Sequence, residues 1–352
     1  YENVKGIYLF NSSKLVISNS FIHNNTYFGI EMGHSSSDNL VYDCQIENNG
    51  NYGIYIVQNS NDNKIYHNNF VDNTAYDSCD NEWGSLYEYA IGNYWDDYNG
   101  IDKNRDGMGD TPYFIEGGEI DSYPLMNPIS DPPFFVWVNN EYNSSFPGWM
   151  LDHFSTISSA VNRVMENGGC FVFPGVYTDN VEIDKEMIIS GAGKEETIVS
   201  GNGKSAFVVN GSNVKVYSFG VKNCWNDAGI AVFANNVEIN DCNCFDNYYG
   251  IYINAINTTV EKSNIFDNSF VGVLIEYSQH ASIKNCSISG NNNGMMIGYS
   301  YYSNLEGNKF LNNSVNALKI SHSYYTIMHH NVFERNLYGA YVEASSNILF
   351  YL

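Results

Sequence analysis

The stretch "NNGNYGIYI", residues 48–56, joins an asparagine-rich turn to a glycine that is followed by apolar, variable and apolar residues. This phrase recurs nine times in the 352-residue chain, at steps of about 21 to 24 residues within each half. Its copies begin at Gly6, Gly29, Gly53, Gly229, Gly250, Gly272, Gly294, Ala317 and Gly339. Self-similarity at such a period is typical of a repeat architecture.

The apolar residues of the repeat alternate over three to five positions, which favours strands over helices. Several short strands per unit, with Gly and Asn at the bends, are typical of one coil of a parallel β-helix. Residues such as Ile54 and Ile56 would then face inward and stack on their copies, about 4.8 Å away in the next coil. Asparagine at the bends tolerates left-handed backbone angles and can bond to its own copy one coil away. The sequence therefore predicts an all-β solenoid.

Two interruptions of the repeat predict two tandem β-helix units. The first unit is expected over residues 1–128 and would end in an Asp/Gly-rich terminal module at about 75–128. A proline-rich linker follows at 129–133, and the second unit is expected over 134–352. Its N-terminal cap, 134–170, would contain a short amphipathic helix within 154–169. Because both chain ends fall inside a repeat, we expect a segment of a longer protein, with the second unit truncated at its C-terminal end.

Three stretches together resemble one protein family. They are the coils, the block "GNYWDDYNGIDKNRDGMGDTPYFIEGG" at 92–118, and the opening "HFSTISSAVNRVMENGGCFVFPG" at 153–175. Nearly the whole chain is similar to the NosD-like, carbohydrate-binding-and-sugar-hydrolase type of right-handed, pectin-lyase-like β-helix. The block at 92–118 resembles the segment that closes such helices in archaeal cell-surface proteins. The resemblance implies the fold and a surface location, whereas this fold hosts lyases, hydrolases, epimerases, adhesins and scaffolds.

The charge of the chain restricts its partners. It has 39 acidic and 16 basic residues, a net charge of −23. Such a chain would repel nucleic acid and anionic membranes, which are bound through Lys and Arg. No run approaches the roughly 18 apolar residues of a membrane span, so no membrane insertion is expected within this segment. Its natural electrostatic partners are cations.

The sequence "DKNRDGMGD", residues 102–110, predicts a calcium site. Side-chain oxygens of Asp102, Asn104, Asp106 and Asp110 and the carbonyl of Met108 occupy ligand positions of an EF-hand-type loop. The loop departs from that pattern at its last position, where Tyr113 replaces a bidentate Glu. Oxygens from Asp96, Asp97, Asp121 or water would complete the site. We expect Ca²⁺ to have a structural role here, and the alternative is an Asp-rich turn without metal.

A carboxylate pair on adjacent coils would be the natural catalytic arrangement of this fold. Asp246 and Asp267 occupy equivalent places, about one strand spacing apart, which is near the separation of a retaining glycosidase pair. The same place holds Asn24, Asn48, Asp72, Asn312 and Arg335 in other coils, which indicates an ordinary solvated turn. The chain has only three arginines to bind an anionic sugar. We therefore expect no catalytic residues, and keep this pair as the alternative.

Aromatic residues offer a second type of surface. Tyr8, Tyr55, Tyr252 and Tyr341 hold the outward position between the inward pairs, where they could form a platform for glycans or a neighbouring protein. A solvated sheet face of high β-propensity is the alternative. Trp95 and Tyr94 are expected to plug the open end of the first core, with a sugar-binding surface as the alternative.

The remaining motifs carry weaker signals. Seven cysteines show no metal spacing and are expected to be buried free thiols, although a Cys224–Cys244 bridge stays open. His329 and His330 lack a surrounding His or Met cluster. We therefore expect them to be turn residues and not ligands of a soft metal. Sequons that permit N-glycosylation occur at Asn11, Asn24, Asn143, Asn210, Asn257, Asn285 and Asn312.

We therefore expect an extracellular, calcium-stabilised cell-surface module without catalytic activity, acting as scaffold, sheath, filament or surface-layer component. Its partners would be surface glycans, other surface proteins or further copies of itself, and the mid-repeat ends allow end-to-end stacking into a homopolymer. A polysaccharide hydrolase or lyase, or a carbohydrate-binding module, is the alternative.

Overall fold

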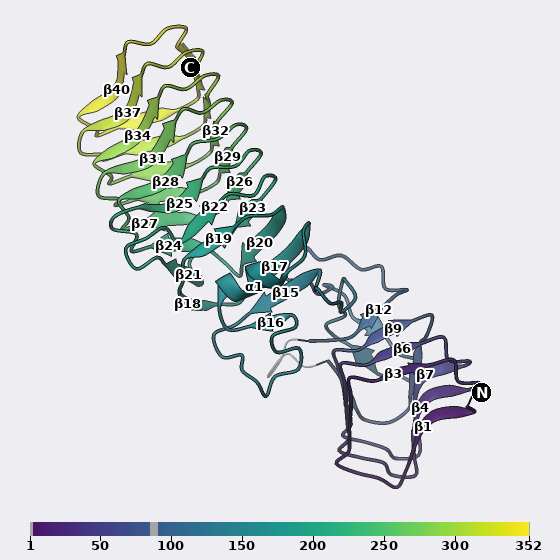
Figure 1. Cartoon of the computed structure of the whole chain (residues 1–352). Coiled ribbons are helices and arrows are strands. Elements are labelled where there is room, and N and C mark those ends of the chain that lie inside the picture. Colours follow the sequence, from purple (N-terminus) through teal and green to yellow (C-terminus); the bar gives the residue numbers. More distant parts are fainter. Residues whose placement is uncertain (1–2, 85–90, 352) are drawn as a thin grey trace. The chain divides into compact units, whose positions relative to one another are not determined.

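The computed structural model describes residues 3–84 and 91–351. The chain forms two compact units, Tyr1–Phe135 with Tyr142–His153, and Val136–Glu141 with Phe154–Leu352. In each unit the chain winds through successive coils whose strands pair in parallel with those of the next coil (Figure 1). The predicted right-handed parallel β-helix is confirmed in both units.

The coils of the first unit contribute strands to three sheets. The first sheet contains β1 (Lys5–Phe10), β4 (Phe28–Gly33), β7 (Tyr52–Ile56) and β10 (Ala75–Asp77). The second contains β2 (Val16–Ser18), β5 (Leu40–Tyr42), β8 (Lys64–Ile65), β11 (Glu82–Trp83), β14 (Ile120–Asp121) and the antiparallel β13 (Tyr113–Phe114). The third contains β3 (Phe21–His23), β6 (Gln45–Glu47), β9 (Asn69–Val71) and β12 (Tyr94–Trp95).

The second unit repeats this plan over more coils. Its first sheet contains β16 (His153–Phe154), β15 (Phe135–Val138), β17 (Gly168–Val172), β20 (Met187–Gly191), β23 (Lys215–Tyr217), β26 (Glu238–Asn240), β29 (Thr259–Glu261), β32 (Ser282–Lys284), β35 (Asn304–Glu306), β38 (Ile327–His329) and β41 (Leu349–Tyr351). Its second sheet contains β18 (Gly175–Thr178), β21 (Thr197–Ser200), β24 (Gly220–Lys222), β27 (Asn243–Phe245), β30 (Asn264–Phe266), β33 (Ser287–Ser289), β36 (Lys309–Leu311) and β39 (Val332–Glu334). Its third sheet contains β19 (Val181–Ile183), β22 (Phe207–Val209), β25 (Ala228–Val232), β28 (Tyr249–Ile253), β31 (Val271–Glu276), β34 (Asn293–Gly298), β37 (Asn316–Ser321) and β40 (Tyr338–Glu343).

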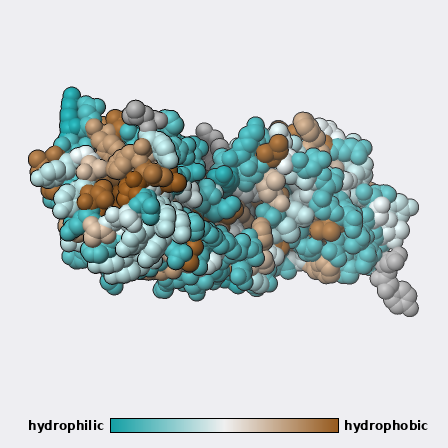
Figure 2. All heavy atoms as spheres, turned by 90° about the horizontal axis from the view of Figure 1, so that it is seen from above, coloured by the Kyte–Doolittle hydropathy of each residue, from teal (hydrophilic) through white to brown (hydrophobic). Residues whose placement is uncertain are grey.

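The cores of both units are the predicted apolar ladders. Ile251 pairs with Val273, and Val273 pairs with Met295, and all three are fully buried. In the last coil β40 and β41 keep apolar side chains exposed, and Figure 2 shows apolar residues gathered at that end of the second unit. Burial in this fold therefore depends on a neighbouring coil.

The short helix α1 (Ile157–Arg163) buries Ile157, Ala160 and Val161 against the first coils of the second unit. It is shorter than the expected range 154–169. Val164 leaves the helical conformation, with ψ at 142°, and Gly168 already begins β17.

Buried asparagines link the coils at one bend. Asn49 accepts hydrogen bonds from the backbone N–H (3.2 Å) and the side-chain amide (2.8 Å) of Asn25. Its own amide donates to Asn73 (2.8 Å) and to the carbonyl of Ile22 (3.0 Å). The residue before it, Asn48, is exposed and has φ at 52°. The sequence predicts that one asparagine both adopts the left-handed backbone and bonds to its copy in the next coil. In the structure Asn48 has the left-handed backbone, and Asn49 makes the bonds between coils.

The second unit has an equivalent ladder, made of Asn247, Asn268, Asn291, Asn313 and Asn336. This ladder explains the glycine of the repeated phrase. A Cβ added at Gly250 would lie 2.5 Å from the carbonyl oxygen of Gly272 and 2.9 Å from the amide nitrogen of Asn268. Because the asparagine and the next strand fill this space, the second residue of the strand that follows the bend is a glycine.

The terminal module closes the first core with tryptophans. Trp95 is only 1% exposed and stacks on Phe70 (4.1 Å) and Tyr113 (4.2 Å) between ring centroids. Trp83 is also buried, with its centroid 5.9 Å from that of Trp95. Trp95 plugs the core as predicted, whereas Tyr94 is only half-buried. Sequence analysis missed the same role of Trp83. Residues 85–90 of this module lie outside the described residues.

The boundary between the units differs from the expected one. Residues 142–153 were assigned to the second β-helix, but they belong to the first unit. Side chains explain the difference, because Asp152 forms a buried hydrogen bond with His67, which lies between β8 and β9.

We predict that Asn268→Ala destabilises the second unit. Its amide donates to the carbonyls of Cys244 and Phe266 and its oxygen accepts from the N–H of Asn247, so alanine leaves buried backbone groups unpaired. Each such group costs about 1–3 kcal/mol, so the midpoint of thermal or denaturant unfolding should fall clearly. The matched control is Asp267→Asn at the exposed neighbour, because the equivalent residue in a later coil is Asn312. Equal midpoints for both variants would contradict the role of the ladder.

All seven cysteines are free. Burial raises the pKa of Cys44, Cys224 and Cys286 to about 11 and that of Cys242 to about 12. Since thiolates are the reactive form, a thiol reagent at pH 8 should label the partly exposed Cys79 first in the native protein. All seven should react after unfolding without reductant, and a smaller number would show a disulfide.

Candidate functional site

The predicted calcium loop is a tight turn whose aspartates accept hydrogen bonds from the backbone of the same turn. Asp102 accepts hydrogen bonds from the N–H groups of Asp106 (3.1 Å) and Gly107 (2.9 Å), and Asp106 accepts from that of Met108 (2.9 Å). Burial raises the pKa of Asp102 and of Asp106, and Asp110 raises both further. A cation would relieve this repulsion.

The acids that were expected to complete the calcium shell have other partners. Asp96 accepts from the N–H of Asp72 (2.7 Å), and Asp97 accepts from the Tyr113 hydroxyl (3.2 Å). Asp121 is buried, and accepts from the backbone and side chain of Asn93 and from the indole N–H of Trp95 (3.0 Å). The buried position of Asp121 assigns it to the core of the terminal module.

Asp246 and Asp267 line a shallow depression of about 450 Å³ on the second unit. Both residues are exposed and lie at turns with φ near 55°. The other lining residues are Asn223, Trp225, Asn247 and Ser269. Sequence analysis missed Trp225, which lies in the turn after β24 and is 55% exposed. The available signal was a tryptophan placed among the polar residues Asn223, Asn226 and Asp227.

The four tyrosines expected to form a platform do not make a continuous one. Glu31 lies between Tyr8 and Tyr55 in the strand register. Tyr55 is already stacked against two aromatic rings, with Phe28 at 4.5 Å and Tyr76 at 5.1 Å between ring centroids. Between Tyr252 and Tyr341 the register runs through Leu274, Met296 and Lys319. Because charged and aliphatic residues separate the tyrosines, the structure favours the alternative to a platform, which is a solvated sheet face.

All seven asparagines of the sequons are exposed. Five of them, Asn11, Asn24, Asn257, Asn285 and Asn312, also have positive φ at the turns. The side-chain amides of Asn210 and Asn257 donate to Glu182 and Asn236.

Sequence analysis did not find a cluster of buried, titratable side chains in the first unit. His67 bonds through Nδ1 to Asp43 and through Nε2 to Oδ2 of Asp152 (2.9 Å). The other oxygen of Asp152 lies 2.7 Å from Nδ1 of His153. His67, Asp152 and His153 are all buried, and they form the one group of three or more His, Cys, Asp or Glu among the described residues whose donor atoms lie within 4.8 Å of one another.

The charges of this cluster are set by mutual contact. Burial disfavours a charge on His67, but Asp152 and Asp43 outweigh it and raise the pKa of His67 to about 10. Burial would raise the pKa of Asp152, yet the two histidines hold it below its usual range. Burial lowers the pKa of His153. The contacts with Asp152 and Asp43 therefore favour the protonated form of His67, and burial favours the neutral form of His153.

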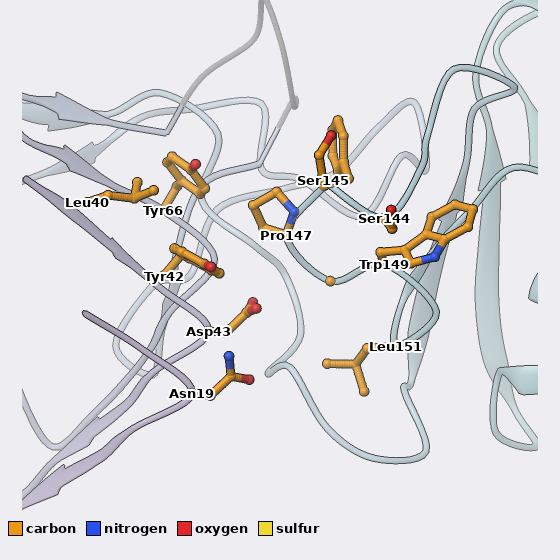
Figure 3. A pocket seen from close by; sticks show the side chains of 12 residues that line it. Asn19, Leu40, Tyr42, Asp43, Tyr66, Ser144, Ser145, Pro147, Trp149 and Leu151 are labelled. Atoms are coloured by element: carbon orange, nitrogen blue, oxygen red, sulfur yellow. The ribbon is translucent and has the colours of Figure 1, made fainter. Parts of the chain in front are cut away.

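A cavity of about 400 Å³ adjoins the cluster, also within the first unit. Leu40, Tyr42, Asp43 and Tyr66 line it from the coils, and Ser144, Ser145, Pro147, Trp149 and Leu151 face them from the segment that follows residue 142 (Figure 3). Gly148 also lines the cavity and contacts the cluster. Gly148 therefore lies between the buried cluster and the cavity.

Several solved structures are similar to this chain at low sequence identity. The periplasmic alginate epimerase AlgG has 9% identity and a TM-score of 0.44, with 94% of this chain and 73% of that chain covered. The pectin methylesterase from Yersinia enterocolitica has 10% identity and a TM-score of 0.40, with 55% and 90% covered. ORF18 of Geobacillus virus E2 has 13% identity and a TM-score of 0.40, with 55% of this chain and 57% of that chain covered. Likeness at this level carries no argument about function.

No curated protein matches the chain. Within the described residues, no helix has the length and apolar character needed to cross a bilayer. A family model described as periplasmic copper-binding protein (NosD) matches residues 1–100 and 179–352, well over half of the sequence. The chain therefore belongs to the NosD family.

Proposed function

We propose that this chain is an extracellular cell-surface module that adheres to neutral glycans and has no catalytic activity. The observation that carries the proposal is the depression around Trp225 on the second unit. The rest of the β-helix serves as a rigid support, since its interior is filled by apolar and asparagine ladders.

The depression has the chemistry that a sugar needs. Trp225 is 55% exposed and offers an apolar surface to the C–H groups of a sugar ring. The indole lies beside Gly203 of the preceding coil, where an added Cβ would be 3.3 Å from the ring. Asp246, Asp267 and Asn223 surround it with hydrogen-bonding groups suited to hydroxyls.

The charge of the depression selects the class of glycan. Its lining contains two carboxylates and no Lys or Arg. The chain as a whole carries a net charge of −23. An anionic polysaccharide such as a polyuronate would be repelled, so the proposed ligand is a neutral glycan.

The same aspartates are poorly arranged for catalysis. A catalytic pair must be held in place by packing and hydrogen bonds. Asp246 and Asp267 are both exposed, and in the described part of the chain neither carboxylate has a side-chain partner that fixes it. We therefore propose that they accept hydrogen bonds from sugar hydroxyls.

A structural calcium ion at Asp102, Asn104, Asp106, Met108 and Asp110 is part of the proposal. The support is that carboxylates crowd a turn whose backbone is already curled around Asp102 and Asp106. Ca²⁺ would neutralise these charges and stabilise the module that closes the first core.

We predict that Trp225→Ala abolishes glycan binding while the fold is kept. The measurement is a glycan array followed by calorimetry with the neutral polysaccharide that binds. Tyr341→Ala is the matched control, because it removes another exposed aromatic side chain from the same unit, and should bind normally. Turnover of any glycan that is lost in Asp246→Ala or Asp267→Ala would overturn the non-catalytic assignment.

We also predict that EGTA lowers the melting temperature of the protein and that Ca²⁺ restores it. Asp106→Ala should melt lower than the unchanged protein, and after EGTA treatment added Ca²⁺ should no longer raise its melting temperature. Restoration by Ca²⁺ but not by Zn²⁺ would distinguish this loop from any nitrogen-containing site. An unchanged melting temperature after chelation would show that the turn holds no calcium.

A further inference from the structure

We propose that the first unit binds a divalent transition-metal ion between His67, Asp152 and His153. This inference concerns a different unit from the glycan depression and does not rest on glycan adhesion. Three observations support it. The donor atoms of the three residues lie close together, Nδ1 of His67 has a carboxylate partner, and a glycine lies directly against all three residues.

The donor set is compact and buried. Nε2 of His67 and Nδ1 of His153 each lie within 3 Å of a different oxygen of Asp152, at 2.9 Å and 2.7 Å. All three donor atoms lie within 4.8 Å of one another. Donors bound to one ion at 2.0–2.2 Å must converge in this way, so small side-chain shifts would complete the site.

The second observation is the role of Asp43. A histidine that ligates a metal usually donates its other ring N–H to a carboxylate, which fixes the orientation of the ring. Nδ1 of His67 has this partner in Asp43, and Nε2 is left to face Asp152 and His153. Asp43 is a positioning residue for His67 in this arrangement.

The third observation is Gly148, which has φ at +71°. A Cβ at this position would lie 2.2 Å from Oδ1 of Asp152, 2.7 Å from Nδ1 of His153 and 3.0 Å from Cε1 of His67. Only glycine lets the backbone come so close to all three ligand residues. Gly148 and Asp43 also line the cavity, so the proposed site lies directly behind the cavity wall.

The donors indicate the class of metal. Two imidazole nitrogens and one carboxylate oxygen suit Cu²⁺, Ni²⁺ or Zn²⁺, whereas Ca²⁺ and Mg²⁺ prefer oxygen ligands. Copper is the metal in the description of the family, and this site fits its divalent form. The soft thiolates preferred by Cu⁺ are not offered, since six of the seven cysteines are buried in the cores. Among divalent ions Cu²⁺ should bind most tightly.

The alternative is that the same side chains form a metal-free clamp. His67 would then join Asp43 and Asp152 through hydrogen bonds alone and tie residues 142–153 to the coils. Stoichiometric metal binding distinguishes the two, because a clamp requires no ion.

The experiment titrates the chelator-treated full chain with Zn²⁺ by calorimetry, and with Cu²⁺ followed by electron paramagnetic resonance. The expected result is one tightly bound ion per chain and a Cu²⁺ spectrum with coupling to two imidazole nitrogens. His153→Gln should lose the site, and Asp43→Asn should weaken Zn²⁺ binding by about 10–100-fold, the usual effect of removing such a partner. Excess Ca²⁺ should not displace the ion.

The control is His330→Gln, because His329 and His330 form an exposed pair whose Nδ1 atoms are 3.1 Å apart. This variant should bind Zn²⁺ as the unchanged protein does. Loss of binding in His330→Gln but not in His153→Gln would overturn the proposal. If His153→Gln fails to fold, the spectrum of the unchanged protein decides, and a Cu²⁺ signal without nitrogen coupling, or no stoichiometric binding, overturns it.

Discussion

The structure depends on the hydrogen bond that an asparagine at one bend accepts from the backbone of the preceding coil. At such a bend the backbone N–H points into the core, where water cannot reach it and an unpaired donor is costly. Asn49 accepts from the N–H of Asn25, and Asn268 accepts from that of Asn247 (3.1 Å). Each coil is therefore completed by a side chain of the next one, and the fold grows only as a stack.

These ladders have a direction, which explains two buried acids. In two ladders of the first unit each amide donates to the oxygen of the next side chain, so the last residue needs only to accept. The ladder Asn68–Asn93 ends on Asp121, and the ladder Asn39–Asn63–Asn81 ends on Asp77. Each carboxylate also accepts the indole N–H of a tryptophan that closes the core, Asp77 from Trp83 and Asp121 from Trp95. Termination of the ladder and closure of the core are thus achieved by the same residues.

The repeated part of the fold could be predicted from the sequence because the residues that determine it lie within a single coil. Alternation places Ile54 inward, and the bend requires asparagine and glycine at fixed offsets. The cluster of His67, Asp152 and His153 lacks such a signal, since 85 residues separate His67 from Asp152. The one local hint is the turn itself, where His67 replaces the Asn19 and Asp43 of the preceding coils. Segment 142–153 was misassigned for the same reason, because its partners are distant in sequence.

The positive-φ turns explain how one scaffold can carry unrelated sites. A turn residue must tolerate a left-handed backbone, but its side chain faces outward and contributes little to the ladders. Asp246 and Asp267 beside Trp225 use these turns in the second unit, and Asp43 and His67 use them in the first. Parallel stacking brings turns of successive coils together, so two substitutions about one repeat apart create adjacent functional groups. Activity can therefore change without any change to the interior, which is why fold and function separate so readily in this architecture.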